Sequence, residues 1–222
     1  MLVGSFAIAD DTVEADALPQ FVDSLSADLN AFWQAEFSRR GFRGWKDATV
    51  VMSDRAFKSE CNPRRADRGV VYCTKDQTVY VPPSSLLEFR DELGVAGDMA
   101  QAFTLAHEFA HHAQLGLKIT RDIAREHKNA GSRRARQKLK IAHELQADCF
   151  AGLWARSLEE RGLLDSGDID EALAALRAIG DDTLNVPRTR WKHGSSQQRA
   201  QWFSVGYETG KLDACDPFSQ AR

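Results

Sequence analysis

The amino-acid sequence predicts an α+β fold that is rich in helices and contains one small sheet. Apolar and aromatic residues recur at helical spacing over residues 18–40, and Gly41 follows as a stop signal. The period then changes, because three short runs rich in β-branched or aromatic residues lie between turn formers at 48–52, 70–73 and 78–82. Helical patterns return after Ser84.

The expected sheet is small and antiparallel, and it is built on a hairpin. Lys75, Asp76 and Gln77 separate the second and third runs, which predicts a hairpin over 70–81 that ends at the following prolines. An edge strand of such a sheet can align an extended peptide by backbone pairing. Helices are expected at 84–93, 98–115, 133–161, 166–179 and 195–207, the second of them with a capping box formed by Asp98 and Gln101.

Length and composition favour a single domain over 1–222. Hydrophobic residues make up 43% of the chain, charged residues 27%, and the formal net charge is −3, as in ordinary globular proteins. No apolar run approaches the roughly 20 residues of a membrane helix. Residues 1–9 are apolar but short and lack a basic leader, so we expect no intact signal peptide; the remnant of a membrane anchor is a hypothesis.

Charge is strongly segregated along the chain. Residues 117–140 contain nine lysines and arginines against Asp122 and Glu126, a net charge of +7, so the rest of the chain carries −10. The segment has no interleaved aromatic residues for base stacking, and we therefore expect no nucleic-acid partner. A solvated helix face or a mobile flap is the preferred interpretation.

The segment 107–111, His-Glu-Phe-Ala-His, carries the chemistry. It falls inside an expected helix, so His107 and His111 are one turn apart and project from the same side. Two imidazoles placed in this way can hold one Zn²⁺ ion, and the adjacent Glu108 is placed to take a proton from an activated water molecule. The motif predicts a zinc hydrolase with Glu108 as general base.

A catalytic zinc ion usually has three protein ligands, so another segment must supply the third. Glu144 and Asp148 lie one turn apart on the helix expected at 133–161; we expect Glu144 to bind zinc and Asp148 to accept the free N–H of a ligating histidine. A solvated acidic helix face is the alternative. His143 competes with Glu144 but points about 100° away on the helix, His112 is expected to be exposed off the ligand face, and His127 has no metal-spaced neighbour.

His193 belongs to a polar cluster at 193–199 that contains a turn, the expected N-cap Ser195 and Arg199. His193 is a candidate donor to the oxyanion of the transition state, and Arg199 is a candidate partner for a carboxylate. A surface turn with a capping serine explains the same cluster equally well.

Four cysteines form an even set without a CxxC pair. Cys61 and Cys73 flank a segment rich in turn formers and are predicted to pair, which leaves Cys149 for Cys215. Two disulfides indicate an oxidising compartment, whereas four buried thiols in a cytoplasmic protein are the equally weighted alternative.

These motifs resemble the bacterial family of putative neutral zinc metallopeptidases, which belongs to the zincins. The resemblance rests on the blocks at 107–112, 144–152, 179–182 and 193–199, with Cys61, Cys73 and the segment 215–218. It implies a zincin core over 61–218, preceded by a less specific region, 1–60, that holds the first helix and strand. It also implies Glu144 as third ligand, Asp148 as the partner of His107, and an N-terminal anchor that places the domain outside the cytoplasm.

The preferred function is therefore a peptidase with one zinc ion, His107, His111 and Glu144 as ligands, Glu108 as base and His193 as an oxyanion donor. Its partner would be a peptide or protein substrate, and membrane contact would occur only through a missing anchor. A zinc-containing peptide-binding module without activity, and a zinc hydrolase of a non-peptide amide, are the alternatives. Extracytoplasmic and cytoplasmic locations both stay open.

Overall fold

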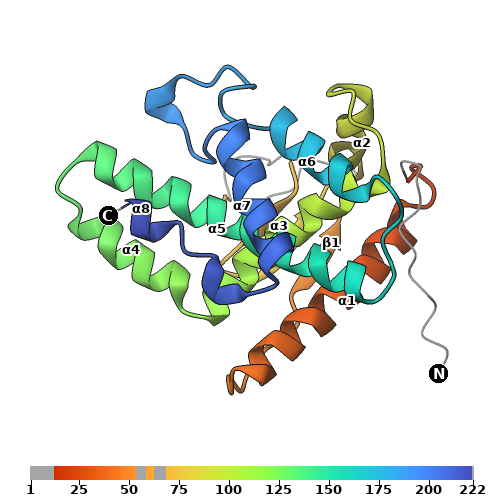
Figure 1. Ribbon diagram of the computed structural model, residues 1–222, viewed down its shortest axis with the longest axis horizontal. Helices are drawn as coiled ribbons and strands as arrows, with labels where there is room; N and C mark the ends of the chain where they lie inside the picture. The colour runs from red at the N-terminus through yellow and green to blue at the C-terminus, as the bar shows by residue number, and fades with distance from the viewer. Residues whose placement is uncertain (1–12, 54–58, 63–68, 222) are drawn as a thin grey trace.

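The computed structural model describes residues 13–53, 59–62 and 69–221, and the apolar stretch at 1–9 lies outside these ranges. Helices dominate the chain (Figure 1). They are α1 (Leu18–Arg39), α2 (Pro83–Asp91), α3 (Asp98–Gly116), α4 (Ile119–Asn129), α5 (Arg133–Glu160), α6 (Asp168–Ala178), α7 (Ser196–Thr209) and the short α8 (Phe218–Ala221), with 3₁₀ turns at Arg188–Arg190 and Leu212–Ala214.

The sheet contains β1 (Thr49–Met52), β2 (Val71–Cys73) and β3 (Thr78–Val81) in the order β1-β3-β2. The hairpin prediction is confirmed, because β2 pairs with β3 in antiparallel register, with Tyr72 opposite Val79. The expectation of a purely antiparallel sheet needs correction, since β1 pairs in parallel with β3. A tight turn forces neighbouring strands to be antiparallel, whereas the long connection over 53–70 allows β1 to take either direction.

The predicted α+β class is confirmed, and α3 lies at the centre of the core. Large aromatic side chains from four helices are fully buried around it: Trp33, Phe103, Phe109, Phe150, Trp154 and Phe203. Each buried side chain of this size stabilises the fold by about 2–3 kcal/mol. Ala102, Ala106 and Ala110, spaced four residues apart along one side of α3, are also buried and let a neighbouring element approach closely.

The basic segment is helical rather than irregular. Its first part forms α4, its last part begins α5, and the two helices form a pair at one end of the molecule with α8 beside them (Figure 1). Ile123 of α4 and Leu139 of α5 are buried in a small apolar cluster with Phe218. Hence the basic residues occupy the outer faces of a packed helix pair.

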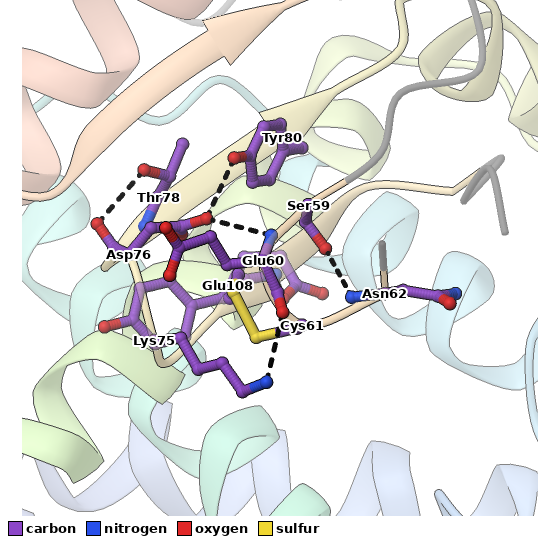
Figure 2. The surroundings of a disulfide bond; sticks show 11 residues. Ser59, Glu60, Cys61, Asn62, Lys75, Asp76, Thr78, Tyr80 and Glu108 are labelled. Carbon is purple, nitrogen blue, oxygen red and sulfur yellow. Dashed lines mark hydrogen bonds between the residues drawn. A yellow bond between two sulfur atoms is a disulfide. The ribbon is translucent and has the colours of Figure 1, made fainter. Parts of the chain in front are cut away.

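Both predicted disulfides are confirmed. Cys61 pairs with Cys73, and Cys149 pairs with Cys215, with Cα–Cα distances of 5.6 and 5.7 Å. The first disulfide joins residues 59–62 to β2 at the hairpin (Figure 2), and the second joins α5 to the C-terminal segment. Among the described residues, no helix has both the length and the apolar character needed to cross a membrane.

Candidate metal centre

Three side chains from two helices converge at the centre of the molecule. His107 and His111 project from α3, and the Nε2 atom of each lies 3.3 Å from the same oxygen, Oε2 of Glu144 on α5. Atoms bound at about 2.0–2.2 Å to one tetrahedral zinc ion are about 3.4 Å apart. The spacing and the donor types therefore fit a single zinc ion.

The other nitrogen of each histidine is already engaged. His107 Nδ1 lies 2.8 Å from Asp148 Oδ1, and His111 Nδ1 lies 2.8 Å from Gln114 Oε1. Each Nδ1–H can donate to its oxygen, which leaves the Nε2 lone pair directed at Glu144. Hydrogen bonds of this kind fix the tautomer and ring orientation of metal-binding histidines.

Arg199 of α7 holds Asp148 in place. Its Nε lies 2.9 Å from Asp148 Oδ2 and its Nη2 lies 2.8 Å from Oδ1, a bidentate pair in which both side chains are buried. Burial raises the pKa of Asp148, but the charge and hydrogen bonds of Arg199 outweigh this effect and lower the pKa below its usual value. Asp148 therefore stays ionised opposite His107, and the predicted interaction of Arg199 with a carboxylate is confirmed.

The charges around the site favour a cation at its centre. Burial opposes the charged form of His107, but the hydrogen bond and charge of Asp148 outweigh it and raise the pKa of His107 to about 10. Burial also opposes ionisation of Glu144, yet His111 and His107 hold its pKa well below the usual range. A divalent ion between these groups would displace the protons on the imidazoles, as metal binding generally does.

Glu108 faces the sheet side of the site. The backbone N–H of Tyr72 in β2 donates to Glu108 Oε2 over 2.6 Å. Burial raises the pKa of Glu108, while the charges of His111 and His107 act in the opposite direction. A carboxylate that is half-buried and has a raised pKa is suited to accepting a proton near neutral pH.

His193 lies in the loop before α7, where the buried Asp181 anchors the backbone. Asp181 Oδ2 accepts hydrogen bonds from the backbone N–H groups of Lys192, His193 and Gly194, over 2.7–3.0 Å. The His193 ring Nδ1 is 3.4 Å from Asp181 Oδ1, and His193 lines the same cavity as Glu144. This loop therefore holds His193 at the cavity that Glu144 also lines.

The remaining histidines take other places. His143 is outside the group formed by His107, His111 and Glu144; its ring stacks on His111 with 5.2 Å between centroids, and burial lowers its pKa to about 3. His112 was expected to be exposed, and this is wrong: it is buried, its Nδ1 is 2.7 Å from Tyr72 Oη and its Nε2 is 2.7 Å from Lys46 O. The reason is that His112 lies one turn after Glu108, on the face of α3 that packs on β2 and Trp45.

Three contributors to the site had no assigned role from the sequence: Tyr72, Gln114 and Asp181. Gln114 lies three residues after His111, a spacing that places both on one face of α3 and could have identified it. Asp181 lies in the block at 179–182 that contributed to the family resemblance, although without a role.

A helix-rich fold in which two helices direct imidazoles and a carboxylate at one point is typical of zinc hydrolases. A family model described as putative neutral zinc metallopeptidase matches residues 6–218, and the chain belongs to this family. The match also includes α1 and β1, so it extends further towards the N-terminus than the resemblance over 61–218.

Relatives of the chain are found in Escherichia coli and Mycobacterium tuberculosis. The uncharacterized protein YpfJ of Escherichia coli (strain K12) is 34% identical over 212 residues, which cover 93% of this chain and 73% of that protein. The uncharacterized protein Rv2575 of Mycobacterium tuberculosis (strain ATCC 25618 / H37Rv) is 35% identical over 178 residues, which cover 72% of this chain and 59% of that protein. No solved structure gives a significant match.

Proposed function

We propose that the protein hydrolyses peptide bonds at one zinc ion bound by His107, His111 and Glu144. The observation that carries this proposal is the convergence of both histidine Nε2 atoms on Glu144 Oε2, with both Nδ1 atoms engaged by neighbouring side chains. A zinc ion at this point would lower the pKa of a water molecule to about 7 and polarise the scissile carbonyl. The substrate would be a peptide or protein.

Glu108 is the general base in this proposal. It adjoins His107 in sequence and lies between the ligand face and β2, and its Oε2 is held by the N–H of Tyr72. Glu108 takes a proton from the attacking water molecule and returns it to the leaving amine. His193 donates a hydrogen bond to the oxyanion, supported by Asp181 behind its ring.

β2 supports the binding of an extended substrate. It is an edge strand of the sheet, and it runs next to Glu108. An extended peptide lying beside β2 would pass the scissile bond close to Glu108. The two disulfides support an extracytoplasmic location for this activity.

The test compares Glu108→Gln with the parent protein for zinc content and for cleavage of a random peptide library. Because the side chain keeps its shape and is no ligand, the variant should retain zinc while hydrolysis falls by about 10²–10⁴. Glu92→Gln, an exposed change at the end of α2, is the matched control and should match the parent. A Glu108→Gln protein as active as the parent would refute the mechanism.

A further inference from the structure

A cavity of about 410 Å³ opens beside the metal centre, between α4, α5 and the loop that carries His193. Glu144 and His193 line it, so it continues directly from the proposed site of hydrolysis. Its residues on α4 include Ile123 and Ala124, and its residues on α5 include Lys140, one turn before Glu144. Part of the basic segment 117–140 therefore lies next to the proposed site of hydrolysis.

One wall of this cavity is apolar and fixed by packing. Ile123 is only 8% exposed and packs in the apolar cluster with Leu139 and Phe218. Ala124 follows it on the same helix, is exposed and lines the same cavity. An occupant therefore meets aliphatic side chains on the α4 side of the cavity.

The charged groups at the cavity are mostly positive. Lys140 of α5 and Lys192 of the loop both line it and both are exposed. Within the described part of the chain, neither ammonium group forms an ion pair. Two nearby carboxylates are engaged elsewhere: Asp122 pairs with Arg125, and Asp181 accepts from backbone N–H groups. The Glu144 carboxylate is turned towards the two histidines. An occupant with its own carboxylate complements these charges.

We propose that this cavity is the subsite for the substrate side chain next to the scissile bond and that it selects glutamate. The two methylene groups of glutamate pack against Ile123 and Ala124, and its carboxylate reaches the ammonium groups of Lys140 and Lys192. This inference rests on the proposed peptidase function and names its substrate class: peptides with an acidic residue at the cleavage site.

The test measures binding rather than turnover, in the zinc-loaded Glu108→Gln protein. Three peptide hydroxamates, identical except for Glu, Gln or Leu next to the zinc-binding group, are titrated by calorimetry. The Glu compound should bind about tenfold more tightly than the Gln compound, the size expected of a charged hydrogen bond at a partly exposed site. Lys140→Gln and Lys192→Gln should each remove most of this preference.

Lys138→Gln is the matched control. It removes the same charge from the same turn region of α5, but Lys138 lines a different cavity on another face of that helix. The preference for Glu should be unchanged in this variant. Equal binding of the Glu and Gln compounds, or tightest binding of the Leu compound, would overturn the acidic subsite alone, whereas binding of none of the three would overturn the zinc site and the subsite together.

Discussion

At the scale of single residues, a buried ion pair outside the candidate ligand set orients one of the histidines. Asp148 and Arg199 have side chains that are 0% and 4% exposed, so both charges are removed from water. Their desolvation is unfavourable, and a buried pair of this kind is weak evidence for stability. The benefit lies in orientation, because the same carboxylate holds His107 Nδ1 and directs Nε2 at Glu144.

Asp148→Asn should therefore weaken zinc binding while the three proposed ligands stay the same. The amide oxygen of asparagine can still accept a hydrogen bond, but its NH₂ group is a donor and cannot accept from His107 or Arg199, so at least one charge-assisted hydrogen bond is lost. We expect zinc affinity to fall by about 10- to 100-fold, measured by competition with a chromophoric chelator. Asp170→Asn, an exposed change on α6, should leave the affinity unaltered. Unchanged affinity in Asp148→Asn would contradict the proposed role.

Residue spacing places His107 and His111 on one helix face and Glu144 and Asp148 on another, because a helix converts a separation of four residues into a shared face. That the two pairs meet in one site was implied by the family resemblance, since spacing alone also allowed a solvated acidic face for the second pair. The contact of Tyr72 with Glu108 could not be predicted from residue spacing. It joins residues 36 apart in the chain and depends on how β2 lies against α3, which no local pattern contains. The same packing explains why the expectation for His112 was wrong.

At the scale of elements, α7 can reach Asp148 because two glycines let it lie very close to α5. A Cβ atom added to Gly152 would be 2.0 Å from the carbonyl oxygen of Phe203, and one added to Gly206 would be 1.9 Å from that of Cys149. Both obstacles are backbone atoms and cannot rotate away. The close crossing of these helices brings Arg199 into the core.

Gly152→Ala should separate α5 from α7 and destabilise the protein. Alanine has the higher helix propensity by about 1 kcal/mol, but overpacking against backbone typically costs about 1–3 kcal/mol and occasionally more. Because a 2.0 Å contact with backbone lies at the upper end of this range, we expect a net loss of about 2 kcal/mol in the free energy of unfolding, measured by urea titration. Gly131→Ala, where a Cβ meets nothing within 4 Å, is the control and should change it by less than about 0.5 kcal/mol.

The sequence located the major helices and strands closely, since hydrophobic period and turn residues are local signals. Two local expectations failed for reasons that are not local. Gly97, with φ of 103°, takes the N-cap position of α3, so Asp98 lies in the first turn and Gln101 instead bonds to Val13 and Leu86. The sequence pattern predicts no separate helix at α4, because Ile123 is its only buried residue and dense positive charge obscures the face that packs on α5.

At the scale of the whole molecule, the two disulfides act over very different lengths of chain. Cys61 and Cys73 are 12 residues apart and fasten a local loop to β2, whereas Cys149 and Cys215 are 66 apart and enclose α6 and α7. A crosslink stabilises the fold mainly by restricting the unfolded chain, and the effect grows with the length of the loop that it closes. The long-range disulfide therefore contributes more to global stability.

Removing each disulfide separately tests this difference. From loop length alone, we expect Cys149→Ala with Cys215→Ala to lower the free energy of unfolding by about 4 kcal/mol, and Cys61→Ala with Cys73→Ala to lower it by about 3 kcal/mol. Both double variants are compared with the oxidised parent by urea titration. The parent with added reductant should lose at least as much stability as the variant without the disulfide between Cys149 and Cys215.

The order in which the disulfides are reduced is a second readout. Because Cys149 and Cys215 are buried while Cys61 is exposed, the short-range disulfide should be reduced first, as mass spectrometry of trapped thiols would show. A larger loss from the pair at 61 and 73, or four free thiols in protein from an oxidising host, would contradict this account of the fold.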